Sequence, residues 1–312
     1  MKEMISGYQF IALSDLERMR EQLLQWAGEL ALSGTVLIAP EGINLSLGGR
    51  PVDLEEWLAR LASGYGITGL IVHRQPVAAV PFLRLKVRIR AEIIAFDPAL
   101  DPGLEATGEA LEPEAWHRLL EQADVQLVDT RNDYEFRIGS FRGADNPGID
   151  RFTEFADWAR EHLDPERPVA MFCTGGVRCE KASARLLADG FSRVYHLRGG
   201  ILAYLQRYAG QPSLWQGECF VFDDRVSLDQ DLRPSARPVC AGCRHPHDGL
   251  PANGMPPVNP GGDCRLCARH FKPGQLAGIR ERVRQIALAR ARGTSHLGPQ
   301  TGVDEKHQVS EA

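Results

Sequence analysis

No stretch of this 312-residue sequence approaches the length of a membrane-spanning helix, and its N-terminal residues contain no apolar run long enough for a signal peptide. The seven cysteines are an odd number, which argues against a disulfide framework in such a chain. We therefore expect a cytoplasmic protein without a membrane partner, in which cysteines serve as nucleophiles or metal ligands.

The chain also lacks an excess of positive charge, because its formal net charge is −5. Any RNA-binding surface must then be a local basic face, and DNA is not an expected partner. There is no dinucleotide-binding fingerprint, so no nicotinamide or flavin is expected, and no pattern of two histidines and one carboxylate indicates an iron site. Internal repeats are absent. Hydrophobic residues make up 43%, which is enough for two or three packed domains.

Residues 1–95 show the element order of an α+β domain of the acylphosphatase or ferredoxin-like type. The order is strand, helix, strand, strand, helix, strand, followed by one strictly alternating strand. In chain order, we predict a strand at 8–13, a helix opened by a capping box at 14–17, a hairpin of 35–39 and 43–47, a helix at 53–61, and strands at 68–73 and 83–89.

Residues 96–120 are rich in proline, glycine and acidic side chains, and we predict a linker there. Residues 121–215 alternate between strands and helices, as a parallel α/β sheet with flanking helices does. The predicted strands are 125–128, 169–172 and 194–196, and the predicted helices are 152–163, 178–189 and 201–208. A Cys-rich, loop-rich region follows at 216–273, and residues 274–312 form a basic helix (275–292) and a disordered tail.

A Gly-rich loop directly follows the predicted strand 169–172 and leads into a helix. Such a loop gathers backbone N–H groups at the positive end of a helix dipole, where a thiolate is stabilised. We therefore predict a lowered pKa for a cysteine at its start, and an arginine at its end that holds an anionic substrate or orients the loop. The loop consists of Cys173, Thr174, Gly175, Gly176, Val177 and Arg178.

The length of this loop distinguishes between two chemistries. Four residues separate Cys173 from Arg178, a shorter spacing than in cysteine-dependent phosphatases. The loop resembles that of rhodaneses, in which the cysteine carries a sulfane sulfur. Flanking residues also agree with the rhodanese pattern: Asp129, Thr130, Arg131, Glu135, Gly139, Gly143 and Ala144 before the loop, and residues 197–200 after it. The agreement of these blocks argues against an ordinary buried structural cysteine.

Two further cysteines have less specific surroundings. Cys179 follows Arg178 in the first helical turn, where it either resolves an oxidised or persulfidated Cys173 or fills a small core position. Cys219 stands beside an apolar strand and is interpreted as structural.

Five longer strings occur together and in one order: residues 39–44, 82–86, 129–135, 173–181 and 217–223. With them the chain resembles, over roughly residues 5–270, the rhodanese-domain family of oxygen-dependent tRNA uridine-34 hydroxylases. One departure is Asn44-Leu45-Ser46, where the family has a glycine after the asparagine. The resemblance implies a bacterial cytosolic enzyme that forms 5-hydroxyuridine at the tRNA wobble position. It also implies molecular oxygen as co-substrate, the anticodon region of tRNA as partner, and a cysteine persulfide at Cys173.

The alternating strand near residue 85 carries a cationic row. Leu83, Leu85, Val87 and Ile89 are predicted to face the core, which leaves Arg84, Lys86, Arg88 and Arg90 on the other face. Neighbouring charges would be about 7 Å apart, close to the phosphate spacing of one nucleic-acid strand. The row either contacts RNA or guards a sheet edge. The arginines of helix 275–292 form a second basic patch or surround an apolar stripe.

Two C-x-x-C knuckles in the Cys-rich region are separated by twenty residues, which is typical of a structural zinc site. Four thiolates would complete a tetrahedron and leave no open position for catalysis. The candidate ligands are Cys240, Cys243, Cys264 and Cys267; the alternative is that these cysteines are reduced and metal-free.

Three functions agree with these patterns. The first is wobble-uridine hydroxylation through Cys173, and the second is a rhodanese-type sulfurtransferase that uses the same thiolate. The third is a non-catalytic RNA-binding or zinc scaffold protein. The sequence does not indicate an oligomeric state.

Overall fold

The computed structural model describes residues 1–100, 102–103, 106–122, 124–235, 237, 239–240, 245–246 and 271–292. These residues divide into two units. One extends over Met1–Cys240 and includes residues 245–246, and the other contains helix α9 (Pro273–Ala291). None of the helices in the described ranges has the length and apolarity that crossing a bilayer requires.

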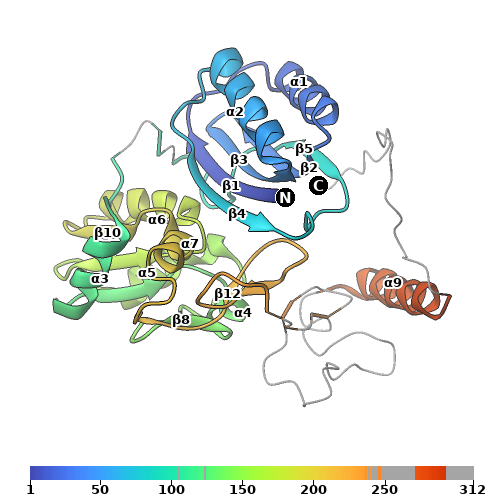
Figure 1. Ribbon diagram of the computed structural model, residues 1–312. Coiled ribbons are helices and arrows are strands. Elements are labelled where there is room, and N and C mark those ends of the chain that lie inside the picture. Colours follow the sequence, from blue (N-terminus) through green and yellow to red (C-terminus); the bar gives the residue numbers. More distant parts are fainter. Residues whose placement is uncertain are drawn as a thin grey trace. The chain divides into compact units, whose positions relative to one another are not determined.

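The first domain is a five-stranded sheet with two helices on one of its faces (Figure 1). The strand order is β4-β1-β3-β2-β5, and only β2 and β5 run parallel. The helices bury Leu23 and Trp57 against Val36 and Leu45 of the sheet. The bounds are β1 Lys2–Phe10, α1 Leu16–Glu29, β2 Ser33–Ala39, β3 Gly42–Gly49, α2 Pro51–Tyr65, β4 Ile71–Val77 and β5 Leu85–Ile89. The predicted acylphosphatase-like α+β fold is thus confirmed.

The face of this sheet that carries no helix has two rows of paired residues. One row runs Ile71–Tyr8–Asn44–Leu37–Arg88, and the next runs His73–Ser6–Ser46–Thr35–Lys86. Paired residues on neighbouring strands point to the same side of a sheet. Tyr8 and His73 therefore share a face with two members of the cationic row, at a distance of three to four strand spacings.

Three local expectations in this domain are wrong. Strand β1 covers Lys2–Phe10 instead of 8–13, because pairing with β3 and β4 on both sides defines it rather than local hydrophobicity. The predicted capping box does not form: Asp15 precedes α1 with φ 50° and makes no side-chain cap. Leu83 lies before the first residue of β5 and is 58% exposed, so it does not belong to the core.

The second domain has a four-stranded, fully parallel sheet in the order β6-β10-β9-β7. Helices α5 and α6 pack on one face around Phe155 and Ala182, while α3 and α7 pack on the other around Trp116 and Tyr204. The bounds are β6 Glu109–Leu111, α3 Pro113–Gln122, β7 Gln126–Asp129, α4 Asp133–Phe136, β8 Gly139–Phe141, η1 Phe152–Glu154, α5 Phe155–His162, β9 Val169–Phe172, α6 Val177–Ala188, β10 Val194–Leu197 and α7 Gly200–Arg207. The predicted rhodanese-type arrangement is confirmed.

The predicted linker, residues 96–120, is too long. Glu109–Leu111 forms the edge strand β6, which pairs with β10, and Pro113–Gln122 forms helix α3. The sequence pattern does not indicate these two elements, because β6 is very short and proline and acidic residues surround it. The second sheet therefore begins within the segment that the composition assigned to the linker.

After α7 the chain forms only short strands. Strand β11 (Trp215–Gly217) pairs with β8, and β12 (Cys219–Phe220) pairs with β13 (Ser227–Leu228). Helix α9 agrees with the predicted basic helix at 275–292. Most of the predicted Cys-rich region and the predicted disordered tail lie outside the described residues.

Candidate active site

The reactive loop lies at the carboxyl end of an inner strand, the usual position of functional loops in parallel sheets. Strand β9 ends at Phe172 and helix α6 begins at Val177, so Cys173 stands first in the connecting loop. The N–H of Gly176 donates to Cys173 Sγ at 3.1 Å. Gly176 has φ 103°, a conformation that side-chain-bearing residues avoid. The Cys173 side chain is therefore held against the start of α6.

The electrostatic surroundings of this sulfur favour the thiolate. Burial raises the pKa of Cys173, because a buried charge loses its hydration. A hydrogen bond from the Cys179 thiol, the charge of Arg178, and the N–H groups of Cys179 and Gly176 outweigh burial and lower the pKa from 9.0 to about 6. Burial and the Cys173 thiolate raise the pKa of Cys179 well above 9.0. At neutral pH one sulfur is ionised and the other is a thiol.

Helix α7 also holds the reactive loop in place through backbone hydrogen bonds. The N–H groups of Ile201 and Leu202, in the first turn of α7, donate to the carbonyl oxygens of Cys173 and Thr174 at 2.9 and 3.1 Å. This contact requires a glycine at position 200, where a Cβ would lie 2.4 Å from the Cys173 carbonyl oxygen. The backbone of the loop is thus fixed on two sides.

Arg178 orients the loop through a buried carboxylate. Its guanidinium donates to both carboxylate oxygens of Glu135 at 2.7 and 2.8 Å, and to Thr174 Oγ1 at 3.4 Å. Burial raises the pKa of Glu135, but the charge and hydrogen bonds of Arg178 hold it below its usual range. Of the two roles expected for Arg178, this geometry favours loop orientation, because the guanidinium is already paired with both carboxylate oxygens of Glu135.

The segment after β7 supports this ion pair. Glu135 also accepts the N–H of Asn132 at 3.2 Å and so caps α4. Immediately before the N-cap residue, Arg131 makes a fully buried bidentate pair with Asp129 at 2.6 and 2.8 Å. Three residues that agreed with the rhodanese pattern, Asp129, Arg131 and Glu135, are therefore buried together in the segment after β7.

The first domain covers the reactive loop. Tyr8 Oη donates to Glu180 Oε1 of α6 at 3.1 Å, and a Cβ at Gly176 would lie 2.7 Å from that hydroxyl oxygen. His73 packs against Gly199, where a Cβ would approach its ring to 2.9 Å. Burial lowers the pKa of His73, which favours the neutral imidazole. Cys173 itself is 1% exposed and belongs to the core of the second domain.

A buried charge cluster connects the two domains beside this cover. Lys181 of α6 is fully buried, and its Nζ contacts Glu41 at 2.7 Å and Glu92 at 2.6 Å. Burial raises the pKa of Glu41 despite its contact with Lys181. Glu41 also accepts the N–H of Ile93 at 2.7 Å. One cation thus bridges two carboxylates of the first domain.

Both domains have recognised relatives, and so does almost the whole chain. Residues 2–93 match the UPF0176 acylphosphatase-like domain, and residues 112–207 match the rhodanese-like domain. A tRNA uridine(34) hydroxylase from Teredinibacter turnerae is 39% identical over 300 residues, which cover 95% of this chain and 92% of the relative. The chain belongs to the tRNA uridine(34) hydroxylase family.

Part of this tRNA uridine(34) hydroxylase family member is also similar to solved structures. A rhodanese-like domain protein from Staphylococcus aureus is 26% identical and covers 31% of this chain and 90% of its own, with a TM-score of 0.27. The polysulfide-sulfur transferase homodimer from Wolinella succinogenes is 30% identical and covers 34% of this chain and 78% of its own, with a TM-score of 0.28.

The remaining cysteines of the family member differ in their surroundings. Cys179 is a buried free thiol, with Thr130 Oγ1 3.6 Å from its sulfur, and its hydrogen bond lowers the pKa of Cys173. Cys219 is also buried, and burial raises its pKa to about 12, which suits the structural role expected for it. Cys240 is buried and its N–H donates to the His245 carbonyl oxygen at 3.0 Å. The other predicted zinc ligands, Cys243, Cys264 and Cys267, lie outside the described residues.

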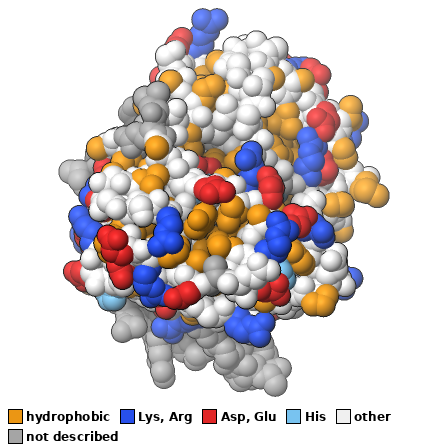
Figure 2. Space-filling model, turned by 90° about the vertical axis from the view of Figure 1, so that its left-hand side faces the viewer, with side chains coloured by type: hydrophobic (Ala, Val, Ile, Leu, Met, Phe, Trp, Pro, Cys, Tyr) orange, Lys and Arg blue, Asp and Glu red, His pale blue; other side chains and the backbone are white. Residues whose placement is uncertain are grey.

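Two members of the cationic row, Lys86 and Arg88, lie on the edge strand β5, and Arg84 and Arg90 flank it. Arg84, Arg88 and Arg90 are exposed and Lys86 is half-buried, while Val87 faces the core as predicted. On the face shown in Figure 2, basic and acidic side chains are interspersed around hydrophobic ones. That mixture agrees with the net charge of −5 and with the expectation that any basic surface is local.

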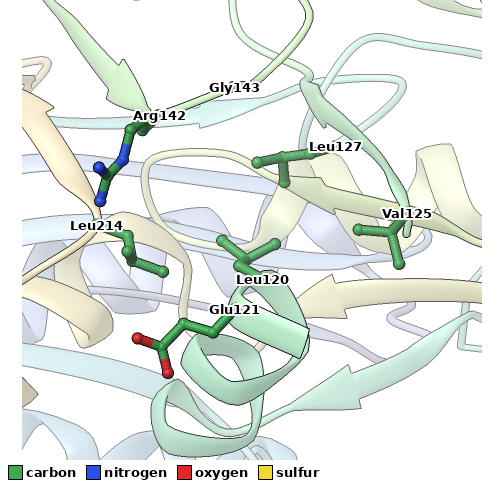
Figure 3. Close-up of a pocket in the computed structure, with 7 residues that line it drawn as sticks. All are labelled: Leu120, Glu121, Val125, Leu127, Arg142, Gly143 and Leu214. Atoms are coloured by element: carbon green, nitrogen blue, oxygen red, sulfur yellow. The ribbon is translucent and has the colours of Figure 1, made fainter. Parts of the chain in front are cut away.

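A surface cavity of about 430 Å³ lies elsewhere, at the edge strand β7 (Figure 3). Leu120, Val125 and Leu127 line it, together with the charged side chains of Glu121 and Arg142. No residue of the reactive loop lines this cavity, so it is separate from the Cys173 site.

Several residues of the site escaped sequence reasoning. Tyr8 and His73 come from the other domain, and Lys181 pairs with Glu41 and Glu92 across the same boundary. Glu41 and Lys181 do lie in the strings that carried the family resemblance, and this was the one available signal. Tyr8 and His73 are single residues within ordinary strands, so the sequence offered no signal for their role in the site.

Proposed function

We propose that this chain is a tRNA uridine(34) hydroxylase that converts the wobble uridine to 5-hydroxyuridine with molecular oxygen in the cytoplasm. The reaction replaces the C5–H bond of uracil with C5–OH. One atom of molecular oxygen enters this bond, and two electrons and two protons from a reductant convert the other atom to water. The similarity to the Teredinibacter turnerae hydroxylase over 95% of the chain supports this assignment.

Cys173 carries the reaction in this proposal. The supporting observation is the position of its sulfur, which accepts the Gly176 N–H at 3.1 Å and has a pKa lowered to about 6. A sulfur that is ionised at neutral pH is a competent nucleophile and can carry a persulfide. The loop residues Thr174 to Val177 supply the backbone that holds it, and Arg178 with Glu135 fixes their orientation.

Cys179 acts as the resolving thiol. Its thiol donates a hydrogen bond to the Cys173 sulfur, so in this proposal it condenses with the sulfenic acid of an oxidised Cys173 and releases water. Because its own pKa is raised, Cys179 stays protonated and serves as a hydrogen-bond donor until that step.

The anticodon loop approaches across the helix-free face of the first sheet. Arg88 and Tyr8 belong to one cross-strand row, three strands apart, which corresponds to about 14 Å. That distance is about two phosphate spacings of a single strand. Phosphates near the wobble base can then contact the cationic row (Arg84, Lys86, Arg88 and Arg90) while the base reaches the reactive loop.

Mass spectrometry of nucleosides in tRNA tests the proposal. In a strain that lacks the gene, 5-hydroxyuridine should disappear and should return with the wild-type gene but not with Cys173→Ser. The matched control is Cys219→Ala, which removes a buried thiol of raised pKa and should restore the nucleoside. An unchanged level of 5-hydroxyuridine in the deletion strain refutes the hydroxylase assignment. Full restoration by Cys173→Ser would show that the thiol is dispensable and would refute the role of the thiolate.

The same thiolate supports a second candidate, a sulfurtransferase, because a persulfide on Cys173 can pass its outer sulfur to a thiophilic acceptor. Purified protein charged with thiosulfate and mixed with cyanide would then form thiocyanate at catalytic rates. Robust turnover in this assay together with unaltered tRNA in the deletion strain would favour the second candidate.

A further inference from the structure

An aromatic side chain stands exposed beside the reactive loop. Phe222 is 67% exposed, although it lies between the buried residues Phe220 and Val226 of one tight turn. The guanidinium of Arg178 lies over its ring, 5.9 Å from the centroid. That guanidinium also contacts Thr174, the residue after Cys173. The ring therefore borders the loop that carries the reactive sulfur.

The turn that carries Phe222 is rigid. The N–H of Val221 donates to the Val226 carbonyl oxygen at 2.9 Å, and Val226 itself adopts φ 68°, a costly conformation for a β-branched residue. Asp223 holds Arg225 in a bidentate pair at 2.6 and 2.8 Å. Such strain persists only where the surrounding structure enforces it. The exposed ring is thus a fixed feature of the surface.

The first domain also fixes this turn. Arg225 reaches strands β1 and β4, where it contacts Met4 Sδ at 2.9 Å and the side-chain oxygen of Gln75. Gln75 lies two residues after His73 on the same strand, and therefore on the same face. The turn consequently contacts the first sheet through Arg225 and the reactive loop through Phe222 and Arg178.

The Phe222 ring packs against a neighbouring aromatic ring, and much of its surface is exposed. Phe220 packs edge-on against it at 5.0 Å, and Tyr134 packs edge-on against Phe220 at 5.2 Å. Arg178 lies over the ring, and 67% of the Phe222 surface remains exposed. Unpaired RNA bases are recognised by stacking on aromatic rings, and every base offers a π-face for this.

We infer that Phe222 is the stacking platform for a base at or next to the wobble position. This inference rests on the proposed function, since it assigns a recognition residue to the same site. Arg178 stabilises the position of the Phe222 ring, because the guanidinium cation and the ring quadrupole attract each other. Phe222 positions the substrate and takes no part in bond formation.

The test uses the full-length protein and an anticodon stem-loop RNA with 5-fluorouridine at position 34. On binding to wild type, the fluorine resonance should shift through the ring current of Phe222. Phe222→Ala and Phe222→Leu should lose this shift and weaken binding by about tenfold to a hundredfold. Phe222→Trp should retain both, since tryptophan also stacks. Val52→Ala, which truncates another exposed apolar side chain, is the matched control and should behave as wild type.

Steady-state kinetics on unmodified tRNA completes the test. Phe222→Ala should raise KM much more than it lowers kcat, and its melting temperature should stay near that of wild type. Wild-type affinity and fluorine shift in both Ala and Leu variants would overturn the inference while leaving hydroxylation intact. Loss of binding in all three variants together with a lowered melting temperature would show a structural role instead. A wild-type protein that neither binds nor hydroxylates the RNA would refute the proposed function itself.

Discussion

Two neighbouring cysteine sulfurs share one proton at the centre of the site. The Cys173 sulfur carries the negative charge because Arg178 and the N–H groups of Gly176 and Cys179 surround it. Cys179 lacks comparable stabilisation and keeps its proton, which it donates to Cys173. Through this hydrogen bond, Cys179 lowers the pKa of Cys173 and favours its thiolate.

This arrangement predicts the pH dependence of Cys173 reactivity. Alkylation of Cys173 by iodoacetamide, followed by peptide mass spectrometry, should titrate with a midpoint near 6, because the lowered pKa keeps the thiolate populated at all higher pH values. Hydroxylation should likewise fall as the pH drops through this value.

Variants of Cys179 separate its hydrogen bond from its bulk. Cys179→Ala removes the donor, so the pKa of Cys173 should rise and the alkylation midpoint should move to higher pH. Cys179→Ser retains a donor and should keep the midpoint low. Identical midpoints for wild type and the alanine variant would contradict the proton-sharing pair.

The contents of the reactive loop could be predicted from the sequence because its residues are contiguous. Cys173, the glycines and Arg178 occupy adjacent positions, so their chemistry could be read without a fold. The partner of Arg178 could not be deduced in this way, since Glu135 lies 43 residues away. Tyr8 is 172 residues from Glu180, and only the packing of two domains brings them together.

At the scale of elements, helix α6 combines catalysis with domain attachment. Its first turn carries Arg178 and Cys179 beside the sulfur, and Lys181 follows with its buried contacts to Glu41 and Glu92. The first turns of α6 therefore contact both the reactive loop and the first domain.

Removal of the Lys181 charge should destabilise the protein strongly. Lys181→Met leaves two partly buried carboxylates facing each other, and we expect the free energy of unfolding to fall by about 3–5 kcal/mol. Urea unfolding monitored by circular dichroism measures this change.

The combined variant Lys181→Met, Glu41→Gln, Glu92→Gln is the control for that experiment. It removes the cation and both anions, so it should recover much of the lost stability. If the single and triple variants were equally unstable, lost packing rather than uncompensated charge would explain the effect.

Strand β5 carries the second element-scale prediction. Neutralising Arg84, Lys86, Arg88 and Arg90 to glutamine should weaken tRNA binding and reduce the slope of log affinity against log salt by about 0.7 for each lost phosphate contact. Fluorescence anisotropy at several salt concentrations measures both quantities.

Four exposed arginines of the second domain provide the matched control: Arg151, Arg160, Arg167 and Arg193. Replacing them removes the same charge but leaves the sheet face intact, so affinity and slope should change much less. Equal effects of the two sets would show that the row acts only through net charge.

At the scale of the whole molecule, the element order was sufficient to predict both domain folds. Alternation of strands and helices identified the parallel sheet, although β6 and α3 were absorbed into the predicted linker. Strand β1 was misplaced because its pairing partners, not its own pattern, define it. How the domains meet was beyond prediction, because Tyr8, His73 and Arg225 contact residues that are distant in sequence.

The four cysteines of the C-terminal region lead to one further prediction. If Cys240, Cys243, Cys264 and Cys267 bind zinc, elemental analysis of purified protein should find about one metal per chain. Cys264→Ser should release it, while Cys219→Ala should not. A folded, active preparation without metal would refute the zinc site.

Burial of the Cys173 sulfur has a consequence for its survival. Ionised thiolates are the side chains that peroxides attack first, and oxidation past the sulfenic acid is irreversible for most proteins. With 1% of its surface exposed, Cys173 should react with dissolved oxidants more slowly than an exposed thiolate of the same pKa. Should a sulfenic acid form there, the adjacent Cys179 thiol will trap it as a disulfide that cellular reductants can repair.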